Sequence, residues 1–204
     1  KLSDFNEDSV LNRMEKQLKK SNIIINNTKK INLTWSIRDI SRNLKQYTNG
    51  EYIFLGNSGP MSQGPLFAIE PGISEDVKLN IGKSPKGIKW AIQRGGPGMA
   101  SPVVSGNFLY VCSRGFLSCY STNEGKRIYK SRLPSSKSIA ASMWADDNFV
   151  FLIDESGKTF VVKSGKDFEI FAENQLDDLF WSTPAISNGN LLLRGANKLY
   201  CIRK

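Results

Sequence analysis

The chain has 204 residues, of which 40% are hydrophobic, and a formal net charge of +9 at pH 7. This length can bury the core of one or two domains, and no apolar run is long enough to span a membrane. The chain contains no histidine. That absence excludes, within this chain, a Ser-His-Asp triad, a Cys-His pair, a histidine metal ligand and histidine acid–base catalysis.

The first 46 residues differ in pattern from the rest of the chain. Residues 3–21 predict a helix, because Ser3 can cap its start, acidic residues follow in the first turn and lysines occupy the last. An apolar stripe at helical spacing, typical of a packing face, is formed by Val10, Met14 and Leu18. A basic connecting segment follows, and INLTWSIRD, residues 31–39, is a candidate outer strand.

Residues 47–204 contain a repeat with a period of 41 residues. Three similar dipeptides, which we call the anchors, mark this repeat: Ser101-Pro102, Ser142-Met143 and Thr183-Pro184. A polar turn follows each anchor, and an apolar strand follows each turn, predicted at 108–112, 149–153 and 191–193. The next predicted strands are 116–120, 159–162 and 199–202. The first two copies add a fourth strand, predicted at 127–131 and 168–172.

An earlier copy of the repeat has a longer internal loop. Asn49-Gly50 predicts a turn before a strand at 52–55, another strand lies within LFAIEPG, and the outer strand spans 88–92. The turn-forming stretch NSGPMSQGP accounts for the extra length. The four predicted units are 47–99, 100–140, 141–181 and 182–204.

Four short strands in each unit of about 40 residues are typical of a β-propeller blade. Blades stack face to face, which explains why these strands are apolar on both faces. We therefore predict an all-β chain of about 3.5–4 four-stranded antiparallel blades with one N-terminal helix. We expect these blades to be part of a seven- or eight-bladed ring. The alternative is a closed four-bladed ring in which residues 31–39 supply the last outer strand.

The stretch ASPVVSGNFLYVCSRGFLSCYSTNEGKRIYK, residues 100–130, resembles the PQQ-like, or quinoprotein-type, β-propeller repeat. Tyr129 stands where that repeat usually has tryptophan, and residues 123–126 stand for its Thr-Gly-Lys turn. GPLFAIEPG and STPAISNGNLLLRGANKLYCI are similar to a bacterial branch of these repeats that is common in secreted proteins of uncertain role. The family includes PQQ-dependent dehydrogenases and the BamB-type lipoprotein of outer-membrane assembly. The resemblance therefore implies a fold rather than one function.

The resemblance transfers no cofactor site to this chain. The dehydrogenases use an adjacent cysteine pair, an aspartate base, calcium ligands and a tryptophan under the quinone. This chain has no adjacent cysteines, and we match no calcium site. Three cysteines in strand patterns are predicted to be small buried hydrophobes: Cys112, Cys119 and Cys201. Three aspartates are predicted to be turn residues rather than catalytic bases: Asp146, Asp147 and Asp154. We expect no catalytic residue, no cofactor and no metal.

Loops after the second and fourth strands of each blade are expected on one face of the ring. That face would gather cations together with Trp181: Arg94, Arg114, Arg132, Lys137, Lys158, Arg194 and Lys198. Arginine and tryptophan are enriched at protein interfaces. The alternative is that the cations are solvated loop tips and that Trp181 belongs to the core. The stretch 95–98, Gly-Gly-Pro-Gly, is either an anion cradle or an inter-blade loop.

The function that we predict is a non-catalytic propeller scaffold. It would bind a protein or glycan through a face centred on Arg94, Arg114, Arg194, Lys158 and Trp181. The alternative is a quinoprotein-type oxidoreductase whose cofactor site lies in blades outside this chain. We expect no nucleic-acid partner and no membrane span. The chain begins with Lys1, which we interpret as a mature or dissected chain, and we expect a periplasmic or extracellular location.

Overall fold

The computed structural model describes residues 48–58, 63–71, 87–187 and 189–203, all within one compact unit, Ile40–Lys204. These residues form fourteen β-strands and contain no helix. The predicted helix at 3–21 and the candidate outer strand at 31–39 lie outside the described residues. In the described part of the chain, no helix is long and apolar enough to cross a membrane.

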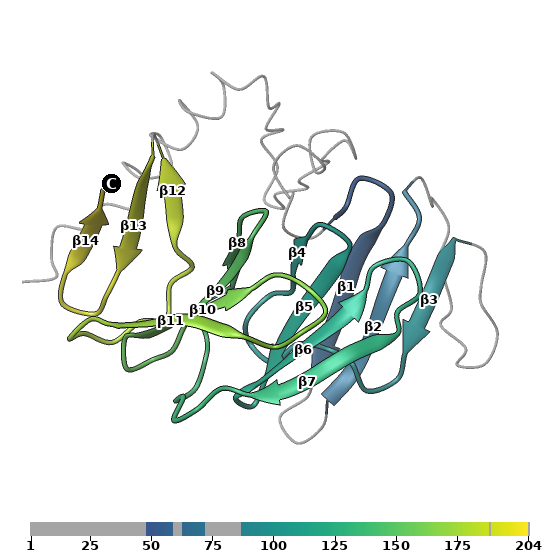
Figure 1. Ribbon diagram of the computed structural model, residues 1–204, viewed down its shortest axis with the longest axis horizontal. Coiled ribbons are helices and arrows are strands. Elements are labelled where there is room, and N and C mark those ends of the chain that lie inside the picture. Colours follow the sequence, from purple (N-terminus) through teal and green to yellow (C-terminus); the bar gives the residue numbers. More distant parts are fainter. Residues whose placement is uncertain (1–47, 59–62, 72–86, 188, 204) are drawn as a thin grey trace, which may run out of the picture. The chain divides into compact units, whose positions relative to one another are not determined.

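The strands form four antiparallel sheets, which we call blades 1 to 4 and which can be followed by their labels in Figure 1. Blade 1 contains β1 (Ile53–Ser58), β2 (Gln63–Ile69) and β3 (Ile88–Ile92). Blade 2 contains β4 (Val103–Ser105), β5 (Phe108–Ser113), β6 (Phe116–Ser121) and β7 (Arg127–Arg132). Blade 3 contains β8 (Trp144–Ala145), β9 (Phe149–Ile153), β10 (Lys158–Lys163) and β11 (Ile170–Gln175). Blade 4 contains β12 (Ala185–Ser187), β13 (Asn190–Arg194) and β14 (Leu199–Ile202).

The structure confirms the all-β prediction and the order of strands in each unit. One strand is displaced: the outer strand predicted at 168–172 runs instead from Ile170 to Gln175 as β11. Phe168 packs against the core between blades 2 and 3, and the pairing of β10 with β11 has an irregularity between Val161 and Val162. Because Phe168 packs against this core, the strand begins at Ile170 and not at residue 168.

The two central strands of blade 2, β5 and β6, are buried on both faces, as stacked blades require. Leu109 and Val111 belong to the core shared with blade 1, whereas Tyr110 and Cys112 belong to the core shared with blade 3. Alternate residues of one strand point to opposite faces of a sheet, so β5 supplies two cores at once. This arrangement explains the unbroken apolar run that the sequence shows.

Hydrogen bonds between blades explain the spacing of the anchors. The backbone N–H of Ser101 donates to Ser142 Oγ at 3.3 Å, and the N–H of Ser142 donates to Thr183 Oγ1 at 3.4 Å. The Ser105 hydroxyl also donates to the carbonyl of Asp146, 41 residues later, at 2.8 Å. Equivalent positions of successive blades are therefore direct neighbours, and the hydroxyls of Ser142 and Thr183 each accept a hydrogen bond from the preceding anchor.

The outer strands dock onto the following blade in two different ways. Trp90 in β3 donates its indole N–H to the carbonyl of Thr122 in blade 2, at 2.8 Å. Tyr129 in β7, the position where the repeat usually has tryptophan, contacts the ring of Phe168 edge-on instead. Its hydroxyl is buried and has no hydrogen-bond partner in the described part of the chain. Each aromatic residue thus fills the gap between its blade and the next.

Blade 4 packs on blade 3 through a smaller core. Leu193 is buried there with Trp144, Ile153 and Phe180, and the rings of Trp144 and Phe151 stack at 5.4 Å. All three residues of β12 are exposed, as is most of β14. Blade 4 is therefore enclosed on one face only within the described residues.

Candidate binding site

At one end of the blades, the turn between the second and third strands of a blade bonds to loops that follow outer strands, either of the same blade or of the preceding one. The N–H of Gly98, after β3, donates to the carbonyl of Cys112 at 2.8 Å. After β7, the N–H of Leu133 donates to the carbonyl of Gly115 at 2.9 Å. The same link recurs after β11, where the N–H of Leu176 bonds the carbonyl of Gly157 at 3.0 Å. We call this side of the blades the loop face.

A pocket of about 610 Å³ opens on the loop face and is lined by residues of blades 1 and 2 and of the loops that follow them. Its size is within the range of ligand-binding clefts. Its walls come from the adjacent ends of β1 and β2, the loop after β3, the β5–β6 turn, the end of β7 and the loop after it. The lining residues are Ser58, Gln63, Gly98, Met99, Cys112, Ser113, Arg114, Gly115, Arg132, Ser136, Lys137, Ser138 and Ile139.

The pocket has a one-sided charge. Arg114, Arg132 and Lys137 line it, and none of its described lining residues is acidic. All three cations are exposed, and none forms an ion pair with a described residue. Arg132 does lie against an aromatic ring, with its guanidinium carbon 5.4 Å from the centre of Phe116. Like charges gathered in a concave surface raise the local concentration of anions, so the pocket favours an anionic ligand. We call it the basic pocket.

The backbone at this pocket is unusual. Arg114 has φ of 53° and Ser135 has φ of 55°, and they are the two non-glycine residues with positive φ in the described part of the chain. Arg114 and Gly115, φ 75°, form the two-residue turn between the paired residues Ser113 and Phe116. Both central residues of such a turn need positive φ, and asparagine or glycine is preferred there. An arginine in this conformation carries local strain, which clusters at functional sites.

Neutral groups complete the walls of the pocket. Gln63 donates its side-chain N–H to the carbonyl of Gly96 at 2.9 Å, which holds the amide at the rim. Met99 is 66% exposed and Ile139 is buried, so the pocket also offers apolar contact. Burial raises the pKa of the Cys112 thiol to about 12. Cys112 is therefore a protonated, apolar wall at neutral pH rather than a nucleophile.

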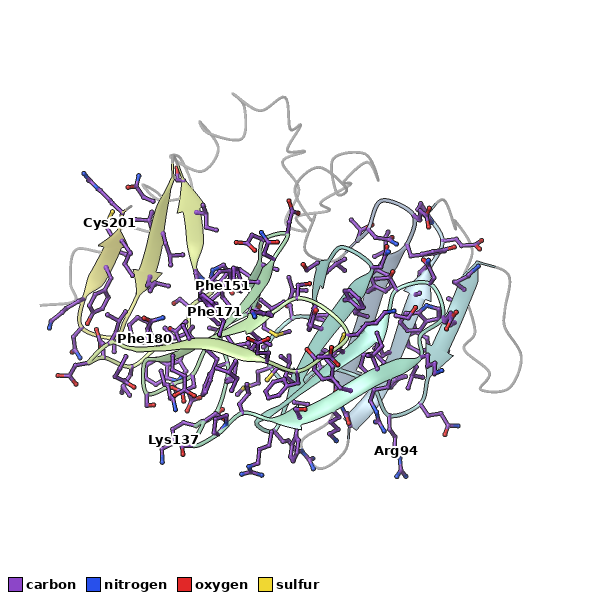
Figure 2. The ribbon with its side chains drawn as sticks, in the orientation of Figure 1. Arg94, Lys137, Phe151, Phe171, Phe180 and Cys201 are labelled. Atoms are coloured by element: carbon purple, nitrogen blue, oxygen red, sulfur yellow. The ribbon has the colours of Figure 1, made fainter. Side chains whose placement is uncertain are left out.

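The structure places the other predicted face residues outside this pocket. Arg94 and Lys137 both project outward from loops that follow outer strands, as Figure 2 shows, but Arg94 is not part of the lining. Arg194 is exposed at the end of β13. Lys158 forms an ion pair with Glu173 at 2.8 Å and is not a free cation.

Trp181 is 52% exposed, in the loop after β11. Trp181 is therefore not part of a core formed by the described residues. The neighbouring Phe180 is the buried residue of this loop, and its ring contacts Tyr200 of blade 4 at 5.6 Å. A run of apolar residues in a loop does not reveal which member points inward, and only the packing of blade 4 decides it.

The glycine-rich stretch at 95–98 is an inter-blade loop. The N–H groups of Gly95 and Gly96 both donate to the carbonyl of Gly64, at 3.2 and 2.9 Å. The N–H of Gly98 is used by Cys112. These donors are occupied within the protein, so the loop builds a wall of the basic pocket and does not cradle an anion itself.

Two aspartates organise turns of blade 3. Asp154 is fully buried, and its carboxylate accepts hydrogen bonds from the N–H groups of Lys137, Ser156 and Lys158 at 2.8, 2.9 and 3.0 Å. This confirms the prediction that Asp154 is a turn residue. Asp146 has a similar local role, accepting from the N–H groups of Asn148 and Phe149.

Asp178, in the loop after β11, organises the turn of blade 4 as Asp154 organises a turn of blade 3. No sequence pattern predicted this role. Its carboxylate accepts hydrogen bonds from the N–H of Asn197 and Lys198, in the turn of blade 4. Burial raises the pKa of Asp178, but the hydrogen bonds from Leu179, Asn197 and Lys198 outweigh it, and the pKa is lowered. Asp178 therefore ties blade 4 to blade 3 in its ionised form.

The fold defines the chain as a protein of the β-propeller class. Comparison with solved structures supports this: the chain is similar to BamB from Moraxella catarrhalis, with a TM-score of 0.52 and 14% sequence identity over 74% of this chain. It is also similar to the Pan2 WD40 domain of Neurospora crassa, with a TM-score of 0.53 and 12% identity over 75% of this chain. At such identities the likeness shows the fold alone.

The similar regions cover 42% of the BamB chain and 43% of the Pan2 chain, so this chain spans less than half the length of the structures it matches. No protein-family model and no curated protein sequence matches it. The propeller prediction is thus supported at the level of fold. The assignment to the PQQ-like type of repeat stays a prediction.

Proposed function

We propose that this chain is part of a non-catalytic β-propeller scaffold that binds a protein or glycan partner through its loop face, with the basic pocket at the centre of contact. The observation that supports this most directly is the set of three cations, Arg114, Arg132 and Lys137, in one pocket without an ion-pair partner among the described residues. β-Propellers are often binding scaffolds. Exposed Met99 and Trp181 add residue types that are enriched at protein interfaces.

We further propose that other blades complete the propeller beside blade 4. Leu199 is 71% exposed on β14, and it is paired with Arg194 on the sheet face opposite the core of blade 3. An apolar sheet face of this kind is what a neighbouring blade covers in the other units. The short coverage of the two similar structures is consistent with this proposal.

A comparison of two triple variants tests the binding function. The pocket variant R114N/R132Q/K137Q removes the three pocket cations. The control variant K126Q/R127Q/K166Q removes three exposed cations from the turns at the opposite ends of the strands, so both variants have the same net charge. Binding of peptide and sulfated-glycan probes is measured by biolayer interferometry at several salt concentrations.

The wild-type chain and the control variant are expected to bind a common probe, with affinity that falls as salt screens the charges. The pocket variant is expected to lose that binding. Equal loss in both variants would show a response to net charge alone and would refute the proposed site. Circular dichroism of all three proteins checks that they are folded.

A further inference from the structure

We infer that the basic pocket takes a polypeptide segment that carries acidic side chains next to an apolar one. This inference rests on the proposed binding function and names the chemistry of its ligand. Three features of the pocket support it: the charges that are available to a ligand, the apolar side chains in its walls, and the backbone conformation of Arg114.

Three carboxylates near the loop face are committed to other partners, whereas Glu155 and Asp177, also in loops of this face, do not line the pocket. Asp154 and Asp178 accept backbone N–H groups, and Glu173 pairs with Lys158. The pocket cations therefore have no internal carboxylate, among the described residues, that competes with a ligand. A guanidinium can bind a carboxylate through two parallel hydrogen bonds. Arg114 and Arg132 supply two such groups on neighbouring elements, and Lys137 adds a third charge.

The remaining surface of the pocket suits a peptide better than a sugar or a nucleic acid. None of its described lining residues is aromatic, so it has no platform on which a base could stack. Its apolar contacts are instead Met99, exposed at the rim, and Ile139 at the wall. A methionine side chain is flexible and polarisable and adapts to varied apolar partners. Aliphatic side chains of a peptide match such a surface.

The conformation of Arg114 identifies it as the central contact. A turn of this kind is most stable with asparagine or glycine at the position that Arg114 occupies. The chain instead places there an exposed guanidinium that has no ion-pair partner among the described residues, at a cost in local backbone strain. The rigid two-residue turn also directs the side chain more firmly than a long loop would. A ligand contact is the physical role that such an arrangement serves.

The experiment is a selection from a display library of short random peptides, with the wild-type chain as bait and soluble R114N variant as competitor. The enriched peptides are then measured by fluorescence anisotropy against the wild-type chain, R114N and K166N. Lys166 is an exposed residue in the β10–β11 turn, so K166N changes the net charge equally at a distance from the pocket lining. A sulfated heparin fragment is measured in parallel.

We expect the enriched peptides to share carboxylates beside aliphatic residues. Their affinity should fall about tenfold or more in R114N, since hydrogen bonds to charged groups have that value, and should be unchanged in K166N. Enrichment of neutral or basic peptides would overturn the inference. The inference would also be overturned if only the heparin fragment bound to the wild-type chain and this binding were lost in R114N. In that case the proposed binding face would still stand. If no probe distinguishes R114N from the wild type, the proposed function fails as well.

Discussion

The turns between the second and third strands of blades 2 and 3 differ in their polar side chains. In blade 3 a carboxylate is buried and bonded inside the protein, and in blade 2 an arginine is exposed to solvent. In blade 3, the turn between β9 and β10 is built around the buried carboxylate of Asp154, which accepts three backbone N–H groups and the Ser156 hydroxyl. In blade 2, the turn between β5 and β6 contains no carboxylate, and Arg114 is exposed in a left-handed conformation. The two turns occupy the same position in the repeat.

This difference separates a structural turn from a candidate binding turn. The buried carboxylate of Asp154 in the blade 3 turn is satisfied inside the protein, so it serves the fold and is not available to a ligand. The charge of the blade 2 turn is not neutralised by any described residue. The following predictions test this contrast, from the largest expected effect on stability to the smallest.

The largest difference is expected between the glycines of the two turns. Both have positive φ, 84° at Gly157 and 75° at Gly115. A Cβ at Gly157 would overlap the backbone carbonyl of Leu176, whereas one at Gly115 would lie 3.2 Å from the movable Ser136 hydroxyl. We expect G157A to lower the free energy of unfolding by about 3 kcal/mol or more, and G115A by about 1–2 kcal/mol, in urea unfolding. Equal losses would contradict the contrast.

Removal of the carboxylate of Asp154 should have the next largest effect. D154A leaves the N–H groups of Lys137, Ser156 and Lys158 without their acceptor in a buried site. We expect a loss of about 2–4 kcal/mol in the free energy of unfolding. The control D147A changes an exposed turn residue and should stay within about 0.5 kcal/mol. A similar small loss in D154A would show that the carboxylate is dispensable for the turn.

Asp178 should make stability depend on pH. Its pKa is lowered in the folded protein, so its ionised form stabilises the docking of blade 4 at pH values above the unfolded-state pKa of about 3.9. That contribution is lost as the pH falls through the lower, folded-state pKa. Urea unfolding of the wild type and D178N between about pH 6 and pH 3 should therefore show a stability difference that shrinks in acid. A difference that does not change with pH would contradict this role.

The smallest effect on stability is expected at Arg114. R114N and R114G each place a preferred residue in the left-handed turn, so unfolding should become harder by up to about 1 kcal/mol, or remain unchanged. Thermal and urea unfolding measure this change. Destabilisation by both variants would mean that Arg114 supports the fold, and the interpretation of its strain as functional would be wrong.

The sequence contained enough information for the fold class because its signals are local. Apolar strands alternate with polar turns, and the anchors recur every 41 residues. That periodicity predicted stacked four-stranded units, and the structure describes four sheets of three or four strands in which Ser101, Ser142 and Thr183 bond to one another in succession. The order of strands within a blade also predicts that Arg114, Arg132 and Lys137 lie on one side of the blades, and all three line the basic pocket.

Only the tertiary structure decided which polar residues of the predicted face have partners inside the protein and which aromatic residue is exposed. Lys158 pairs with Glu173 across β10 and β11, Trp181 is exposed while Phe180 is buried, and Asp178 binds the turn of the next blade. The strain at Arg114 is likewise invisible in sequence, because it arises from the turn that pairing of β5 with β6 imposes. The sequence by itself determined the repeating unit, since strand and turn preferences act between neighbours in the chain. The pocket depends on contacts between residues far apart in the chain, which only the packing of the blades brings together.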